Sequence, residues 1–222
     1  MLRWLWEAHG APKLDRYVPN LTPPRPRNVT ATRAEIDALI AHARPALRAM
    51  LILCSDLAIR SGTAVKIGYD NYDPERHTLS FTSKKDAHVT LATTQAVQEL
   101  IDQCDPNSRL PFISQIRARE VARRGRPSRH PQMNVGTLHV ELKALRAKLG
   151  ITKRIIFHDL RRSAAVAALR YTGNLRTVQS LLGHRSLQST IWYLDHDLYP
   201  VDTDTLEAIK KPHLVWKKEH TA

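Results

Sequence analysis

The hydrophobic and polar positions divide the chain into helical stretches with one β-rich interruption. Residues 32–35 read Thr-Arg-Ala-Glu, a capping box that predicts a helix with Ile36, Leu39 and Ile40 on one face. Residues 46–59 are apolar on most sides, which predicts a buried helix. The remaining expected helices cover 94–103, 134–149 (closed by Gly150), 158–172 (closed by Gly173), 174–183 (opened by Asn174 and ended by Gly183), 187–195 and 203–211.

The β-rich interruption lies between the second and third of these helices. Residues 78–83 and 88–92 are rich in strand-forming side chains and are separated by the polar turn 84–87. This pattern predicts a hairpin or a three-stranded meander. The expected fold class is therefore mainly α, with a small antiparallel hairpin or three-stranded sheet.

The first 29 residues differ from the rest of the chain. Residues 11–29 contain five prolines, which exclude a helix or a central strand and favour a stiff, extended linker. Residues 1–10 have the apolar spacing of a short helix and are interpreted as the end of a preceding unit. The main domain is expected to cover residues 30–222.

Composition limits the class of protein. Hydrophobic residues make up 42% of the 222 residues, which is typical of a globular chain. No apolar run reaches the roughly 18 residues of a membrane span, and the first residues lack the features of a signal peptide. Two cysteines, Cys54 and Cys104, do not make a disulfide framework or a metal-ligand spacing. A soluble, cytoplasmic protein without a membrane segment is expected.

Charge indicates the kind of partner. Lys and Arg total 34 against 21 acidic residues, which gives a formal net charge of +13 and a pI near 10.1. Such a balance favours a polyanion, most often nucleic acid, although solubility or contact with ribosomes or acidic lipids would also explain it. Residues 114–130 form a basic tract, interpreted as a loop that either is solvated or contacts the DNA backbone. Its arginines are Arg117, Arg119, Arg123, Arg124, Arg126 and Arg129.

Five short stretches carry candidate chemistry, and two of them are unremarkable alone. Arg60 is expected to close the buried helix 46–59, where most arginines are solvated or ion-paired. Lys84 and Lys85 lie in the predicted hairpin turn, where lysines are usually solvated. Neither stretch by itself indicates a site.

The other three stretches lie near the C-terminus. His158 and Arg161 are three residues apart at a helix start and so share one face. Their ordinary explanation is helix capping by the imidazole and an ion pair with the guanidinium. His184 follows a Leu-Gly pair at a helix end, and Tyr193 comes nine residues later, where a half-buried core tyrosine would be unexceptional.

Taken in order, these stretches resemble the active site of the tyrosine recombinase (phage integrase) family. That pattern is an arginine after a buried helix, a lysine in a β-turn, His-x-x-Arg, Leu-Gly-His and a tyrosine about nine residues on. The runs HDLRRSAA and VQSLLGHRSLQSTIWY are similar to the family's last two boxes, and the resemblance covers roughly residues 30–210. The matching residues are Arg60, Lys84, His158, Arg161, His184 and Tyr193.

The resemblance implies a catalytic domain that cuts and rejoins double-stranded DNA through a 3′-phosphotyrosine at Tyr193. It further implies a homotetramer on two duplexes, and it makes residues 1–10 the last helix of a core-binding domain. Two departures concern Arg60: the family usually has glycine two residues earlier and an acid three residues later, where this chain has Ala58 and Thr63.

The chemistry of the residues agrees with this implication. Two arginines can form bidentate bonds to the non-bridging oxygens of a phosphate, and a tyrosine needs a base or a cationic pocket to attack it. Within the resemblance, Lys84 is expected to protonate the departing 5′ oxygen, and Tyr199 is spaced wrongly to be the nucleophile. No metal ligands or nucleotide-binding loop are found, so no cofactor is expected. Two alternatives stay open: a type IB topoisomerase, and a non-catalytic DNA-binding regulator that retains the fold.

Overall fold

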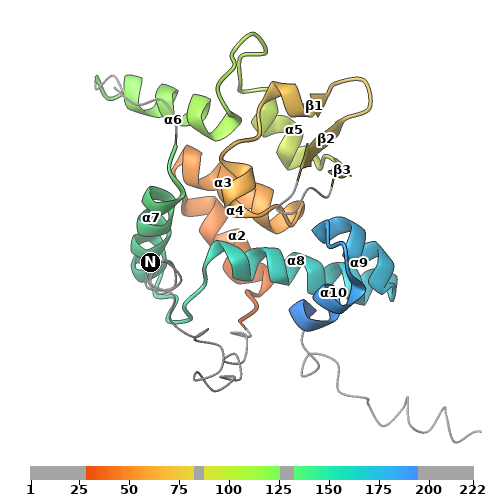
Figure 1. Cartoon of the computed structure of the whole chain (residues 1–222). Coiled ribbons are helices and arrows are strands. Elements are labelled where there is room, and N and C mark those ends of the chain that lie inside the picture. Colours follow the sequence, from red (N-terminus) through yellow and green to blue (C-terminus); the bar gives the residue numbers. More distant parts are fainter. Residues whose placement is uncertain (1–28, 83–87, 126–132, 195–222) are drawn as a thin grey trace, which may run out of the picture.

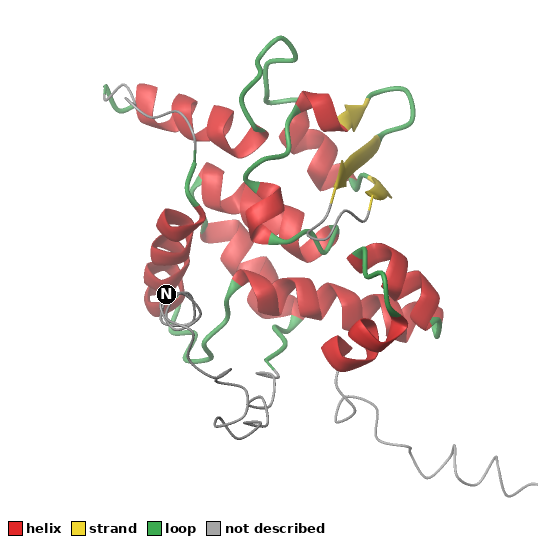
Figure 2. Ribbon diagram, in the orientation of Figure 1, coloured by secondary structure: helices red, strands yellow, loops and turns green. Residues whose placement is uncertain are grey.

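The computed structural model describes residues 29–82, 88–125 and 133–194. Within these residues the protein is mainly helical with one three-stranded antiparallel sheet (Figures 1 and 2). The predicted fold class is thus confirmed. The expected helices at 1–10 and 203–211 and the linker up to residue 28 lie outside the described residues.

The elements follow the chain in a simple order. They are α2 (Arg33–His42), α3 (Pro45–Asp56), α4 (Ser61–Ala64), the 3-10 turn η2 (Tyr69–Asn71), β1 (Tyr72–Asp73), β2 (Thr78–Thr82), β3 (His88–Ala92), α5 (Gln95–Ile101), α6 (Phe112–Ala122), α7 (Val135–Lys148), α8 (Phe157–Thr172), α9 (Leu175–Leu182) and α10 (Leu187–Leu194).

Helix α3 is the centre of the main hydrophobic core. It packs against α2, α5, α6, α7 and α8, and Leu51 and Leu53 on it are fully buried. The predicted capping box opens α2: Thr32 Oγ1 accepts from the Glu35 amide at 3.2 Å, and the Thr32 amide donates to Glu35 Oε2 at 2.7 Å. Local capping thus sets the residue at which α2 begins.

The sheet has the order β1-β2-β3, and the predicted hairpin is present. Leu79 pairs with Leu91 and Phe81 with Val89, and the buried members of these pairs face the core. The hairpin turn, residues 83–87, lies outside the described residues.

A second, smaller hydrophobic cluster holds the C-terminal helices. It contains Ala165 and Val166 of α8, Val178 and Leu182 of α9, and Leu194 of α10, together with Ala58. Because Phe157 and Leu160 of the same α8 belong to the main core, that helix runs from one cluster into the other. The middle of α8 therefore lies where the two clusters meet. In Figure 1, α8 runs from α3 toward α9 and α10.

The expected end of the buried helix was wrong. Helix α3 ends at Asp56, not at residue 59, because Ala58 adopts a left-handed backbone with φ +50°. Arg60 therefore does not close α3; it stands at the N-cap of the single-turn helix α4. A left-handed alanine is unfavourable by about 1–2 kcal/mol, so the surrounding packing must hold it.

The interpretation of residues 114–130 as a loop was also wrong for its first part. Residues up to Ala122 belong to α6, because Phe112, Ile113 and Ile116 bury one face of it in the main core. Residues 126–132 lie outside the described part of the chain.

Candidate active site

The first turn of α8 presents His158 and Arg161 on one face. Asp159, which is 2% exposed, accepts a hydrogen bond from the Ile156 amide at 2.9 Å and so closes the start of the helix. The cap is therefore supplied by Asp159 and not by the His158 imidazole. His158 is left to face the C-terminal helices.

Arg161 is buried, and backbone carbonyls hold its guanidinium. Nη1 donates to the carbonyl of Ala58 and Nη2 to the carbonyl of Leu182 at 2.7 Å. Burial, followed by the nearby Arg60, lowers the pKa of Arg161 to about 10. The left-handed turn at Ala58 aims its carbonyl at this arginine, so the irregular backbone before Arg60 has a structural role.

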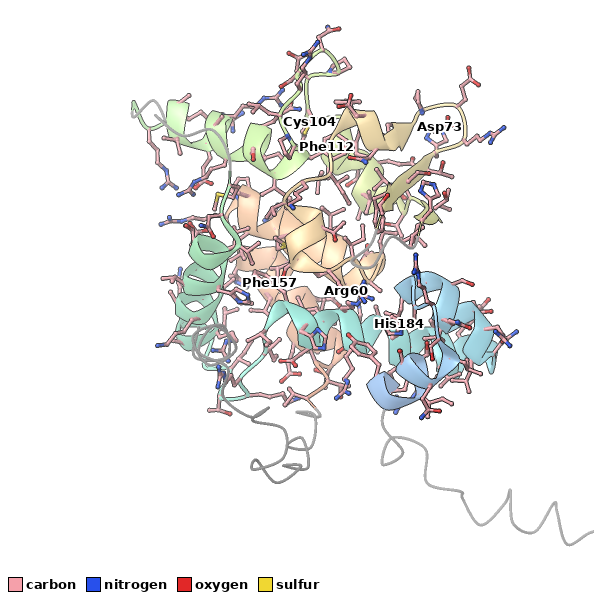
Figure 3. The ribbon with its side chains drawn as sticks, viewed as in Figure 1. Arg60, Asp73, Cys104, Phe112, Phe157 and His184 are labelled. Carbon is pink, nitrogen blue, oxygen red and sulfur yellow. The ribbon has the colours of Figure 1, made fainter. Side chains whose placement is uncertain are left out.

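Arg60 lies on the side of α4 that faces the C-terminal helices (Figure 3), close enough to Arg161 for its charge to lower the pKa of that residue. It is partly buried, and burial lowers its pKa, an effect that the nearby Tyr193 opposes. Two guanidinium groups therefore share one partly dehydrated region. Like charges held together in this way are typical of an anion-binding site.

His184 is positioned by the end of α9. Gly183 closes that helix in a left-handed conformation with φ +59°, and the Gln179 side chain donates to the His184 carbonyl at 2.9 Å. The imidazole Nδ1 lies 3.1 Å from Thr190 Oγ1. Burial and then Arg161, Arg60 and His158 lower the pKa of His184 to about 4, so its ring is neutral near pH 7.

Tyr193 on α10 lies between these groups. Its ring meets His158 edge-on at 5.0 Å and His184 at 5.6 Å between centroids, and its hydroxyl donates to the His158 carbonyl at 3.3 Å. The guanidinium carbon of Arg161 is 5.9 Å from the ring centroid. Burial outweighs the neighbouring cations and raises the pKa of Tyr193 to about 12.

Sequence reasoning did not single out Arg162 or Thr190. Arg162 is 2% exposed, donates to the Tyr193 carbonyl, and has its guanidinium carbon 5.3 Å from that ring's centroid. Its place four residues after His158 puts it on the same helical face, which is a signal that could have indicated it. Thr190 stands one helical turn before Tyr193.

Five of the six predicted catalytic residues thus come together at one place. They are Arg60, His158, Arg161, His184 and Tyr193. Lys84, its neighbour Lys85 and the alternative tyrosine Tyr199 lie outside the described residues. Within the described ranges, no three His, Cys, Asp or Glu side chains gather as metal ligands would, and no helix is long and apolar enough to cross a membrane.

The basic tract lies elsewhere. In Figure 1, α6 is at the opposite edge of the molecule from α9 and α10. Arg117 forms ion pairs with Glu120 at 3.1 Å and Glu141 at 3.4 Å, and Arg124 pairs with Glu120 at 3.2 Å. Part of this tract's charge is therefore balanced within the protein. As DNA contacts, the ion-paired Arg117 and Arg124 and the exposed Arg119 and Arg123 all stay predictions. Arg126 and Arg129 fall outside the described residues.

Solved structures share this fold. The XerA recombinase matches with a TM-score of 0.57 and 20% identity over 96% of this chain and 73% of that one. The XerH site-specific recombinase, in a structure bound to its difH substrate, matches with a TM-score of 0.59 and 18% identity over 88% and 57%. The fold is that of tyrosine recombinase catalytic domains.

Sequence comparison gives the family. The Phage integrase family pattern matches residues 30–198. Tyrosine recombinase XerC of Brucella melitensis is 30% identical over 167 residues, which are 74% of this chain and 50% of the relative. The chain belongs to the phage integrase family, and it spans about half the length of that relative.

Proposed function

We propose that this chain is the catalytic part of a site-specific DNA recombinase that cleaves and rejoins strands through a phosphotyrosine at Tyr193. The observation that carries the proposal is the set of groups that surround the Tyr193 side chain. Two histidines lie edge-on to its ring, and the guanidinium groups of Arg161 and Arg162 lie within 6 Å of the ring centroid. The family match and the names of the relatives support the same function, and favour it over strand relaxation by a topoisomerase.

The phosphate is bound chiefly by arginines. A guanidinium has five N–H donors, and the two backbone carbonyls occupy two of those on Arg161. Arg161 also interacts with the Tyr193 side chain, and its further N–H groups, together with Arg60, are the donors proposed for the non-bridging oxygens of a scissile phosphate. Because the carbonyls hold Arg161 in place before DNA arrives, little reorganisation is needed when charge develops on those oxygens.

Cleavage needs two proton transfers. The hydroxyl of Tyr193 attacks phosphorus, a Tyr193–phosphate bond forms and the bond to the 5′ oxygen breaks. Burial lowers the pKa of His158, so its ring is neutral near pH 7 and can accept the phenolic proton. Lys84 donates a proton to the departing 5′ oxygen. Rejoining reverses these steps, and it needs no ATP because the phosphotyrosine retains the energy of the broken bond.

Double-stranded DNA is the proposed partner, and the protein is proposed to act as a homotetramer on two duplexes. One neighbour in fold, XerH, was solved bound to its difH substrate. The net charge of +13 supports binding to a polyanion.

The test is covalent capture on a library of nicked duplexes with randomised arms. Cleavage near a nick releases a short fragment and traps the phosphotyrosine, so the adduct survives detergent and its peptide is identified by mass spectrometry. The adduct should map to Tyr193. Tyr193→Phe should abolish it while leaving DNA binding nearly unchanged, because only one hydroxyl is lost.

Two controls complete the experiment. Tyr171→Phe removes the hydroxyl of a tyrosine that is 92% exposed on α8, and Tyr199→Phe tests the other nearby tyrosine. Both variants should keep the adduct. An adduct that persists in Tyr193→Phe and is lost in Tyr199→Phe would overturn the assignment.

A further inference from the structure

The hydroxyl of Thr190 is buried inside the site. Thr190 is 0% exposed, lies on α10 three residues before Tyr193, and places Oγ1 at 3.1 Å from Nδ1 of His184. A buried hydroxyl left without a partner costs about 1–3 kcal/mol. The contact with His184 satisfies it, and the same contact fixes the plane of the imidazole.

The contact also bears on which ring nitrogen carries the proton. A neutral imidazole has one N–H donor and one acceptor nitrogen, whereas a hydroxyl can either donate or accept. The groups facing His184 are Arg161, Arg60, His158 and Tyr193, and with burial they keep its ring neutral near pH 7. If Thr190 donates to Nδ1, the proton of the ring must be on Nε2.

Phosphate oxygens at this site can only accept hydrogen bonds. A His184 ring with its proton on Nδ1 would present a lone pair at Nε2 to that anion, which is repulsive. A ring with its proton on Nε2 would present a donor. The buried hydroxyl therefore decides whether His184 attracts or repels the phosphate.

We propose that Thr190 is a positioning residue that donates to Nδ1 of His184 and holds the ring as the Nε2–H tautomer, a neutral hydrogen-bond donor toward the scissile phosphate. This inference rests on the proposed function. Thr190 acts through His184 and does not itself touch the reacting atoms.

Nitrogen-15 NMR of the imidazole tests the tautomer without any DNA. With His184 assigned by comparison with His184→Gln, the free protein near pH 7 should show an unprotonated Nδ1 and a protonated Nε2. Thr190→Ser keeps the hydroxyl and should keep this pattern. Thr190→Val fills the same volume without a donor, so the Nδ1 resonance should move toward the value averaged over the two tautomers of an unconstrained imidazole. A protonated Nδ1 in the wild type, or the wild-type pattern in Thr190→Val, would overturn the proposal.

Single-turnover cleavage of the captured substrate supplies the second measurement. With enzyme in excess over DNA, Thr190→Val should cleave roughly tenfold more slowly, as expected for one hydrogen bond. Thr190→Ser should recover most of that rate. Equal rates for the Val and Ser variants would contradict the positioning role. If Thr190→Val does not fold, Ser against Ala gives the same comparison, since that pair differs by one oxygen.

The two measurements separate this inference from the proposed function. If no phosphotyrosine forms even in the wild type, the proposed function fails, and the NMR experiment still decides whether Thr190 sets the tautomer. If the adduct forms but the tautomer does not depend on the hydroxyl, only the role of Thr190 is refuted.

Discussion

The lowered pKa of His184 should make folding stability depend on pH in a defined window. Its pKa falls from 6.5 in an exposed ring to about 4 in the folded protein. Below about pH 6.5 the unfolded chain therefore takes up a proton that the folded protein does not, so stability falls as pH is lowered from 6.5 toward 4. Above pH 6.5 both states are neutral at this ring and the effect vanishes.

The magnitude follows from the shift and from the exposure of the ring. Uptake of one proton by the unfolded chain alone lowers the free energy of unfolding by about 1.36 kcal/mol per pH unit. Between about pH 7 and pH 5, the stability lost through His184 is therefore at most about 2 kcal/mol. Because His184 is partly exposed, solvent screening reduces this figure, and about 1 kcal/mol is the expected value.

Urea unfolding at about pH 7 and about pH 5, followed by circular dichroism, measures the effect. His184→Gln removes the titrating ring, so this variant should lose about 1 kcal/mol less stability than the wild type over that interval. His88→Gln removes an exposed histidine on β3 and controls for the loss of an imidazole as such. If His184→Gln and the wild type lose equal stability, burial and the two arginines do not suppress protonation of this ring, and the description of its environment is wrong.

Three further predictions concern catalysis and strain. Replacing the bridging 5′ oxygen of the DNA by sulfur makes a leaving group that needs no proton. Lys84→Ala should therefore cleave normal DNA roughly 10²–10⁴-fold more slowly than the wild type, and should cleave the sulfur-substituted strand at a nearly normal rate. Arg161→Ala should stay slow on both, and a rescue seen with Lys85→Ala instead would move the role to that neighbour. Adduct formation should persist in excess EDTA without ATP, because arginine, lysine and histidine already supply the positive charge; loss on chelation with recovery in magnesium would contradict this. Ala58→Gly should change the free energy of unfolding by less than about 1 kcal/mol, since relief of a left-handed alanine (about 1–2 kcal/mol) offsets the loss of one buried methyl (about 0.8 kcal/mol) and the entropy of glycine in the unfolded chain (about 0.5–1 kcal/mol). A loss of stability well above about 1 kcal/mol in urea unfolding would refute the strain.

Local signals in the sequence predicted most helix ends. The capping box at Thr32 and Glu35, Asn174 before α9, and the left-handed Gly173 and Gly183 all act through neighbours within a few residues. The end of α3 was misjudged because Ala58, a strong helix former, takes a left-handed conformation that only its distant packing partners enforce.

The residues of the site were predicted from their types and spacing, but the hydrogen bonds that hold those residues in place were not. The contact from Arg161 to the Ala58 carbonyl joins residues 103 positions apart, and the contact from Arg162 to the Tyr193 carbonyl joins residues 31 positions apart. No periodicity in the chain encodes such pairs, since they arise only when α8 packs against other elements. Thr190 escaped notice for the same reason: on the sequence it is one polar residue among several before the tyrosine.

The two carbonyl contacts of Arg161 have a consequence for mutational surveys of this domain. One contact is with Ala58 in the turn after α3 and the other with Leu182 at the end of α9, so this side chain ties together two distant segments that both pack in the second hydrophobic cluster. A screen that scores only the amount of folded protein in cells should therefore rank Arg161 with apolar core positions, whereas Tyr193→Phe should pass it. Loss of recombination in an Arg161 variant is informative about chemistry only once its folded fraction is known.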